Sequence, residues 1–194
     1  MRIGWCRSQL FAAAMVWAVP AVAGQANLGD RINRPHYRVG DTWKIRIYNS
    51  TGTENRTRII KFLKIKGKGL FFVESDTLPN SQSSLPSRTY SEKSANSMYQ
   101  FPLSVGQVRS GHHPDSDALP SDTFEYKVIG SENVTTKAGT FPCLKIDVNF
   151  TFQGKPYKQV VYFSAVAKRD VRIETWPGAA KLPQISELVE LNLK

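Results

Sequence analysis

The sequence predicts a mainly β protein, an antiparallel sheet that forms a sandwich or a curved half-barrel with little helix. Segments in which apolar and polar residues alternate recur roughly every 10–15 residues, separated by turns rich in Gly, Pro, Asn and Ser. No segment shows a convincing helical period. Strands joined by short turns, without helices between them, favour antiparallel pairing.

Residues 1–23 are predicted to be a cleaved secretory signal peptide. Arg2 and Arg7 provide a positively charged start, residues 10–22 are apolar apart from one proline, and residues 21–23 (AVA) fit the small-x-small cleavage pattern. The apolar run is shorter than the roughly 20 residues that span a bilayer, so an uncleaved membrane anchor is the disfavoured alternative. We therefore expect a periplasmic or extracellular protein whose mature chain has no transmembrane span.

The mature chain is predicted to be a flexible lead-in, residues 24–36, followed by one β domain, residues 37–194. Cys6 lies in the predicted signal, so only Cys143 would remain and no intramolecular disulfide could form. The formal net charge of +10 for the whole chain favours anionic partners by long-range attraction.

The first predicted strand covers residues 42–48, where the apolar and charged side chains alternate: Trp43, Ile45 and Ile47 against Lys44 and Arg46. Residues 57–66 form the next predicted strand, and a turn at 67–69 leads into a strand over 70–74. Because Phe62 and Leu63 both compete for the core face, the pattern predicts a β-bulge near them.

Two stretches are predicted to be irregular. Residues 75–98 are Ser-rich and contain two prolines, which favours a loop, with a helix at 90–100 as the weaker alternative. Residues 110–122 are predicted to form a second loop.

The last third carries the clearest strand pattern. Predicted strands cover 124–129, 144–152, 160–164, 171–175 and 185–193, with turns at 137–140 and 154–156. In the 144–152 strand, Phe150 is expected to be fully buried and Thr151 to lie on the opposite face.

One cluster of side chains could bind a metal: His112, His113 and Asp115. Adjacent histidines on an extended chain point to opposite sides, and Pro114 keeps His113 extended, so the pair would chelate poorly. A solvated loop is therefore the favoured interpretation, and no metal or other cofactor is expected.

Catalysis is not expected. The sequence has no Gly-x-Ser-x-Gly elbow, no phosphate-binding glycine loop and no His-Glu-x-x-His motif. Cys143 has no neighbouring base in the sequence, so small buried packing is favoured over a reactive or partner-linked thiol.

Four lysines could form an anionic-partner patch: Lys61, Lys64, Lys66 and Lys68. Basic residues interleaved with aromatic ones can bind nucleic acid, but an exported protein is expected to meet anionic lipid, glycolipid, cell-wall polymer or an envelope protein instead. The favoured alternative is a solvated strand face whose lysines discourage edge-to-edge aggregation.

Three phrases carry a family resemblance: residues 37–43 (YRVGDTW), 101–106 (FPLSVG) and 138–146 (AGTFPCLKI). On these phrases the chain resembles the DUF3108-like and TapB-like exported bacterial envelope proteins, a group of unknown function. The resemblance implies a β-rich envelope domain and brings no catalytic residues. The group's Tyr-Ser-Pro strand end is replaced here by residues 162–165 (YFSA).

The leading functional hypothesis is a non-enzymatic periplasmic domain that binds an apolar or anionic envelope ligand, or a partner protein, on its sheet. The first alternative is a structural or assembly protein of the envelope with no small-molecule ligand. A hydrolase is the third.

Overall fold

The computed structural model describes residues 31–66, 69–79, 88–93, 98–112 and 119–194, and the regular structure in them is entirely β. The strands are β1 (Arg31–Ile32), β2 (Thr42–Tyr48), β3 (Glu54–Lys66), β4 (Gly69–Thr77), β5 (Arg88–Lys93), β6 (Leu103–Ser104), β7 (Val108–His112), β8 (Thr123–Thr136), β9 (Gly139–Phe152), β10 (Lys155–Ser164), β11 (Arg169–Pro177) and β12 (Gln184–Asn192).

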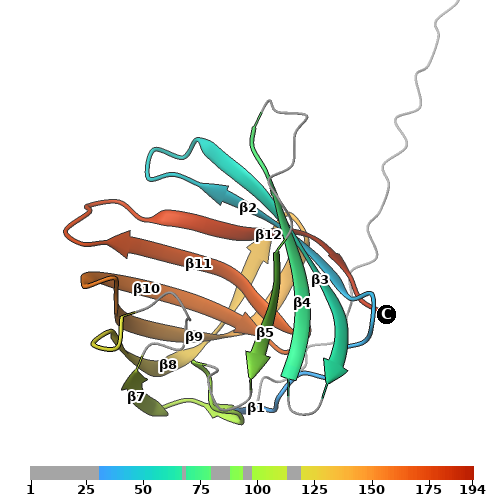
Figure 1. The fold of residues 1–194 in the computed structure, drawn as a ribbon, viewed down its shortest axis with the longest axis horizontal. Coiled ribbons are helices and arrows are strands. Elements are labelled where there is room, and N and C mark those ends of the chain that lie inside the picture. Colours follow the sequence, from blue (N-terminus) through green and yellow to red (C-terminus); the bar gives the residue numbers. More distant parts are fainter. Residues whose placement is uncertain (1–30, 67–68, 80–87, 94–97, 113–118) are drawn as a thin grey trace, which may run out of the picture.

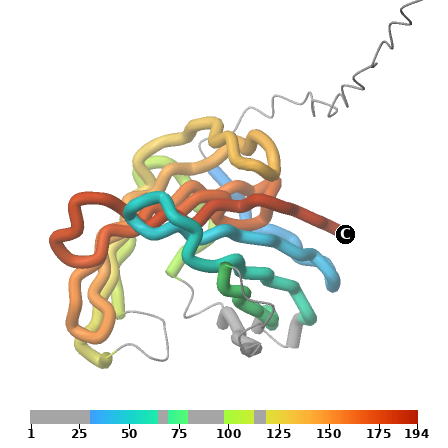
Figure 2. The backbone as a smooth tube through the Cα atoms, turned by 90° about the horizontal axis from the view of Figure 1, so that it is seen from above, coloured from blue at the N-terminus to red at the C-terminus, as the bar shows by residue number. Residues whose placement is uncertain are grey.

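Ten of these strands form one antiparallel sheet in the order β5-β4-β3-β2-β12-β11-β10-β9-β8-β7, and β1 pairs with β6 apart from it. The predicted mainly β, antiparallel fold is confirmed. The sheet is strongly twisted and curled (Figures 1 and 2). Neighbouring strands in this sheet are consecutive in the sequence except at one place, where β2 pairs with the C-terminal strand β12. On its other side β2 pairs with β3.

The two faces of the sheet are distinguished by burial along β8. Phe124, Tyr126 and Val128 are buried, whereas Glu125 and Lys127 between them are exposed. We call the face of the buried residues the inner face and the other the outer face. Residues directly paired across antiparallel strands share a face. The register therefore carries the inner face across six strands, through Val128, Ile146, Val161, Ile173, Ser186 and Ile47.

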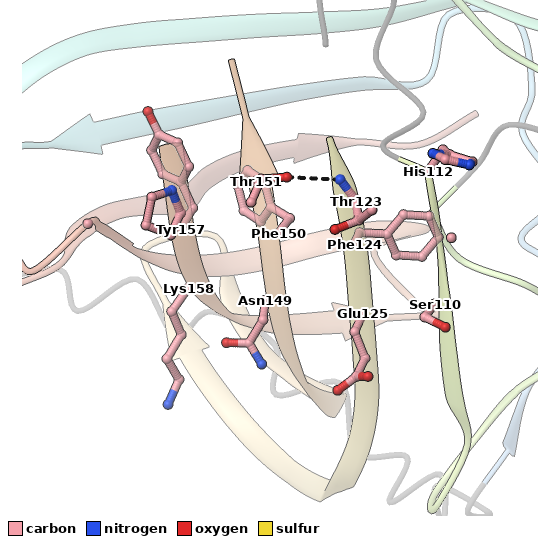
Figure 3. Close-up of a pocket in the computed structure, with 13 residues that line it drawn as sticks. Ser110, His112, Thr123, Phe124, Glu125, Asn149, Phe150, Thr151, Tyr157 and Lys158 are labelled. Carbon is pink, nitrogen blue, oxygen red and sulfur yellow. Dashed lines mark hydrogen bonds between the residues drawn. The ribbon is translucent and has the colours of Figure 1, made fainter. Parts of the chain in front are cut away.

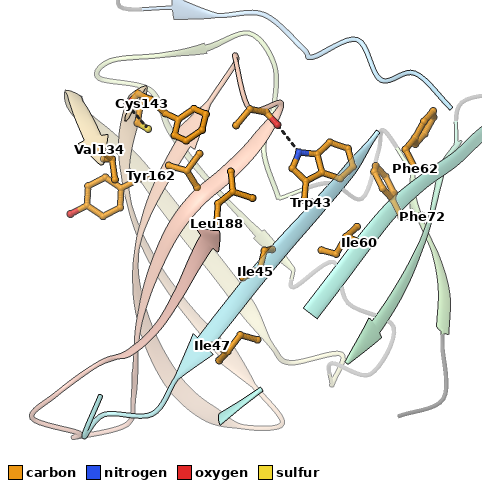
Figure 4. Close-up of a cluster of buried hydrophobic side chains, with 13 residues drawn as sticks. Trp43, Ile45, Ile47, Ile60, Phe62, Phe72, Val134, Cys143, Tyr162 and Leu188 are labelled. Carbon is orange, nitrogen blue, oxygen red and sulfur yellow. Dashed lines mark hydrogen bonds between the residues drawn. The ribbon is translucent and has the colours of Figure 1, made fainter. Parts of the chain in front are cut away.

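Two hydrophobic clusters make up the core. One is built around Trp43 and Leu188 and includes the aromatic side chains of Phe62 and Phe72 (Figure 4). The other contains the inner-face residues of β8, β9 and β10 and is covered by Ile32 of β1, Leu103 of β6 and the half-buried Met98, Tyr99 and Phe101. The apolar inner face is thus largely covered by the chain itself.

The start of β2 and the segment before it are joined by hydrogen bonds to the turn between β10 and β11. Trp43 Nε1 donates a hydrogen bond to the Ala167 carbonyl at 2.7 Å, and the Tyr37 hydroxyl donates to the Lys168 carbonyl at 2.9 Å. Asp41 is fully buried, and its carboxylate lies 2.7 Å from Lys168 Nζ. Gly40 has φ of 94°, which a side chain would disfavour. These contacts explain why Tyr, Gly, Asp and Trp occur together in this stretch.

The predicted bulge in the second strand is confirmed. The β3–β4 register shifts between Phe62 and Lys64, so that Ile60 and Phe62 are both buried while Leu63 is half-buried. Ile59, on the other face, is 40% exposed.

The prediction that residues 75–98 and 110–122 are irregular was partly wrong. β4 extends to Thr77 and β5 occupies Arg88–Lys93, so residues 75–98 contribute strand, and residues 90–93 are not helical. Residues 110–112 belong to β7. β5 and β7 are the short strands at the two edges of the sheet. Pairing with the longer strands β4 and β8 outweighs their weak sequence pattern.

Two further expectations need correction. Residues 31–32 of the predicted flexible lead-in form β1, where Ile32 is buried against Leu103 and its neighbours. Phe150 is half-buried rather than fully buried, because it lies near the end of the sheet. Within residues 144–152 the buried side chains are those of Leu144, Ile146 and Val148.

The predicted signal peptide, residues 1–23, lies outside the described residues. Within the described ranges, no helix is long and apolar enough to cross a membrane.

Candidate binding surface on the outer face

An open depression with a volume of about 740 Å³ lies over the ends of β7, β8, β9 and β10 (Figure 3). Cross-strand pairing arranges its lining in three rows. We call the first the polar row, and it consists of Ser110, Glu125, Asn149 and Lys158. The next, the aromatic row, consists of Phe124, Phe150 and Tyr157. The last, the threonine row, consists of His112, Thr123, Thr151 and Pro156.

The polar row lies on the outer face, since Glu125 alternates with the buried Phe124 and Tyr126 and the other members pair with it across the strands. Figure 3 shows Lys158, Asn149, Glu125 and Ser110 side by side, one from each strand. All four are exposed. Together they offer a carboxylate, an amide, an ammonium group and a hydroxyl, which include both donors and acceptors of hydrogen bonds. Their formal charges, one negative and one positive, cancel.

The polar row continues beyond the depression onto β11. Lys158 pairs directly with Trp176, so the indole lies on the same outer face next to the lysine. Trp176 is half-buried and therefore presents part of its ring to solvent. A flat apolar surface thus lies at one end of a line of hydrogen-bonding groups.

The threonine row is held in place by hydrogen bonds. The Thr123 N–H donates to Thr151 Oγ1 at 2.9 Å, the contact drawn as a dashed line in Figure 3. Next to it, the Asp122 carboxylate accepts N–H groups from Leu119, Gln153 and Gly154 at 2.7, 2.7 and 3.0 Å. One buried carboxylate therefore joins the segment before β8 to the β9–β10 turn.

The pKa of Asp122 reflects these contacts. Burial alone would raise the pKa of this carboxyl, but the backbone N–H groups of Gly154, Leu119 and Gln153, with the Thr151 hydroxyl, outweigh it and lower the pKa from its ordinary value. The carboxylate therefore stays ionised at neutral pH and keeps accepting its hydrogen bonds, so this end of the depression is pre-organised.

The aromatic row belongs to the inner face, since Phe124 is one of the buried residues that define that face and Phe150 and Tyr157 pair with it across the strands. The rings of Phe150 and Tyr157 are stacked, with centroids 5.1 Å apart and an interplanar angle of 10°. Phe124 is buried and lies parallel to Tyr126, at 6.4 Å. The Phe150–Tyr157 stack joins β9 to β10 on the side of the sheet opposite the polar row, whereas the Phe124–Tyr126 contact lies within β8.

The structure places two of the four predicted patch lysines. Lys61 and Lys64 are exposed on the outer face of β3, on either side of the bulge, and Lys64 Nζ lies 5.8 Å from the centre of the Phe71 ring. The half-exposed Ile59 lies on the same face. The side chain of Lys66 and all of Lys68 lie outside the described residues. We call Ile59, Lys61, Lys64 and Phe71 the basic patch.

The predicted metal candidates are divided between described and undescribed residues. His112 is exposed at the end of the edge strand β7, whereas His113 and Asp115 lie outside the described residues. Among the described residues, no three His, Cys, Asp or Glu side chains come close enough together to hold a metal ion.

Cys143 is fully buried, as the packing interpretation expects, and its Sγ lies 3.3 Å from the Phe141 carbonyl. Burial raises the pKa of the thiol to about 12, and the charges of Asp170 and Glu132 add to the increase. This pKa leaves almost no thiolate at neutral pH, so Cys143 is a core residue.

Sequence reasoning missed the depression. Alternation does predict that Asn149 points away from the core, but it cannot show that Ser110, Glu125 and Lys158 stand beside it. That arrangement depends on the register of four strands, including β7, which has little strand signal of its own. The one available signal was the run of outward polar residues along the 144–152 strand.

Comparison with known proteins supports the fold. No model of a known protein family matches the chain, and no curated protein matches it. A solved structure of a putative exported protein with a YmcC-like fold from Bacteroides fragilis is 14% identical, with 84% of this chain and 99% of that chain covered and a TM-score of 0.51. A putative lipoprotein from Parabacteroides distasonis is 14% identical, with 82% and 98% covered and a TM-score of 0.53.

At this identity the likeness shows the fold alone. The chain therefore shares its β architecture with proteins described as exported or as lipoproteins. The resemblance to the DUF3108-like and TapB-like group stays a prediction, since no family model matches.

Proposed function

We propose that this chain is an exported, non-enzymatic domain that holds a polar component of the cell envelope on the outer face of its sheet. The observation that carries the proposal is the polar row along the depression, where exposed hydrogen-bonding side chains from four adjacent strands form one line on the outer face. The fold shared with exported proteins and the secretory pattern of residues 1–23 support the location.

An apolar ligand on the inner face is less well supported. The apolar side chains there, such as Tyr126, Val128, Ile146 and Val148, are fully buried, and β1, β6 and the aromatic residues 99 and 101 already cover them. A lipid would have to displace this cover, whereas the polar row on the outer face is exposed as it stands.

A second candidate function rests on the basic patch. Exposed Lys61 and Lys64 flank apolar side chains on one face, an arrangement that favours contact with an anionic membrane surface. The patch and the depression lie at opposite ends of the sheet order, on β3–β4 and β7–β10, so the two contacts do not compete for the same residues.

The test uses the mature chain, residues 24–194, and three isolated envelope components: peptidoglycan, polysaccharide and membrane vesicles. We expect the protein to co-sediment with at least one of them and to leave it chemically unchanged, as judged by mass spectrometry. The variant Glu125→Gln/Asn149→Ala/Lys158→Ala, with an unchanged circular dichroism spectrum, should lose most of this binding. Binding to none of the components, equal binding by the variant, or release of cleavage products would overturn the proposal.

A further inference from the structure

We propose that the polar row and Trp176 form a binding site for an extended, uncharged glycan chain. This inference rests on the proposed function and names the class of ligand. The evidence is the shape, the charge and the chemical character of the line that runs from Ser110 to Trp176.

The shape suits an extended chain. The line crosses β7, β8, β9, β10 and β11 at right angles to the strands, with one outward residue from each. Neighbouring strands are about 4.8 Å apart, so the line is roughly 19 Å long. A compact small molecule would touch only part of it, whereas a chain of several linked sugar rings would contact all of it.

The charge disfavours an anionic polymer. Glu125 lies between Ser110 and Asn149, directly in the path of the chain. A phosphate or carboxylate on every repeat would meet this carboxylate, and like charges at short range are unfavourable. Lys158 balances Glu125, so the line carries no net charge and suits a neutral ligand.

The chemical character suits vicinal hydroxyl groups. Each sugar hydroxyl both donates and accepts a hydrogen bond. The Asn149 amide also does both, the Glu125 carboxylate accepts, and the Lys158 ammonium donates. Because the side chains point outward from a rigid sheet, little conformational freedom is lost by the backbone on binding.

Trp176 adds an apolar surface that suits the face of a sugar ring. The C–H face of a pyranose ring is apolar, and an indole offers a flat apolar surface at low entropic cost. Its position beside Lys158 would let one sugar ring lie over the indole while the next reaches the lysine. An uncharged chain with apolar ring faces and polar edges fits this order of groups better than an extended peptide, whose side chains alternate.

The experiment titrates mature protein with three neutral hexasaccharides, made of α-1,4-linked glucose, β-1,4-linked glucose and β-1,4-linked N-acetylglucosamine, by isothermal calorimetry and by amide chemical shifts. We expect at least one to bind saturably, with a Kd at least tenfold lower than that of its monosaccharide. Amide shifts should be confined to the ends of β7–β11. Asn149→Ala and Trp176→Ala should each raise the Kd about tenfold, the loss that about 1.4 kcal/mol produces.

Lys127→Ala is the matched control, because Lys127 is exposed on the outer face of β8, two residues from Glu125. It should change the Kd less than twofold. Failure of every neutral chain to bind, or equal effects of Lys127→Ala and Asn149→Ala, would overturn the glycan inference. Binding of polygalacturonate or of membrane vesicles through Asn149 and Lys158, without neutral glycans, would overturn it while leaving the proposed function standing. Binding of none of these, and of no peptidoglycan, would remove both.

Discussion

Asp41 and Lys168 form an ion pair inside the domain, with Oδ2 and Nζ 2.7 Å apart although 127 residues separate them in the chain. The same carboxylate accepts the backbone N–H of Arg38 and of Lys194, each at 2.8 Å. One side chain therefore joins the segment before β2, the β10–β11 turn and the C-terminus.

Replacing Asp41 with Ala should destabilise the domain strongly. The change leaves the Lys168 ammonium, only 16% exposed, without its counter-charge, and breaking a buried pair in this way costs about 3–5 kcal/mol. Urea denaturation measures the loss. Glu190→Ala is the control, because the Lys44–Glu190 pair is equally short, at 2.6 Å, but Glu190 is 67% exposed, and such pairs contribute about 0–1 kcal/mol. Similar losses for both variants would contradict the structural role of Asp41.

Acid should remove the contribution of Asp41. Burial, the largest influence, would raise the pKa of this carboxyl, but hydrogen bonds from Lys168, Lys194 and Arg38 and the charge of Lys168 lower it below its ordinary value of 3.8. A lowered folded-state pKa stabilises the fold above pH 3.8, and this stabilisation is lost as pH falls further, toward the folded-state pKa. The stability difference between the wild type and Asp41→Asn should therefore shrink below pH 3.8, as followed by urea denaturation at stepped pH. A difference that stays constant to lower pH would show that the charge of Asp41 is not involved.

The 144–152 strand should tolerate change on one face only. Ile146 is fully buried, and truncating it to Ala should cost about 2–5 kcal/mol through lost transfer energy and a cavity. Asn149 is exposed, so Asn149→Ala should change the free energy of unfolding by no more than about 0.5 kcal/mol. Thermal and urea unfolding of both variants check the assignment. A large loss for Asn149→Ala would also mean that its effect on ligand binding could not be separated from its effect on folding.

How much could be predicted from the sequence differs between the fold and the site. The strand Thr42–Tyr48 and the bulge at Phe62 follow directly from alternation, because local spacing decides which side chains reach the core. β5 escaped prediction because its strand pairing with β4 comes from tertiary context, which its Ser-rich surroundings do not reveal. Phe150 was misjudged because alternation gives a residue's face but not its distance from the end of the sheet. The depression could not be predicted, since it depends on which residues of four strands stand opposite one another.

Cys143 should be inert in the folded protein. Its pKa of about 12 leaves only about one thiol in ten thousand ionised at pH 8, and its side chain is fully buried. A disulfide reagent should therefore react slowly with native protein and quickly in denaturant, as followed by absorbance. Because the folded-state pKa is raised, the thiol's contribution to stability is fully present below pH 9.0 and is lost progressively as pH rises toward about 12. Rapid reaction under native conditions would show that the thiol is accessible.

The basic patch should bind anionic membranes more strongly than an equal number of lysines elsewhere on the protein. Lys61 and Lys64 lie together on the outer face of β3 beside Ile59 and Phe71, so both ammonium groups can approach one lipid surface while the apolar side chains meet the headgroup region. Each such lysine contributes about 1 kcal/mol near an anionic surface, so Lys61→Gln/Lys64→Gln should weaken binding to phosphatidylglycerol-containing vesicles about 30-fold. The control, Lys127→Gln/Lys155→Gln, removes the same charge from exposed sites on β8 and β10 and should have a smaller effect. Raising the salt from 0.1 to 1 M shortens the Debye length from about 10 to about 3 Å and should abolish the difference. Equal binding by both variants, or binding to neutral vesicles that salt does not change, would leave Lys61 and Lys64 as residues that keep the strand soluble.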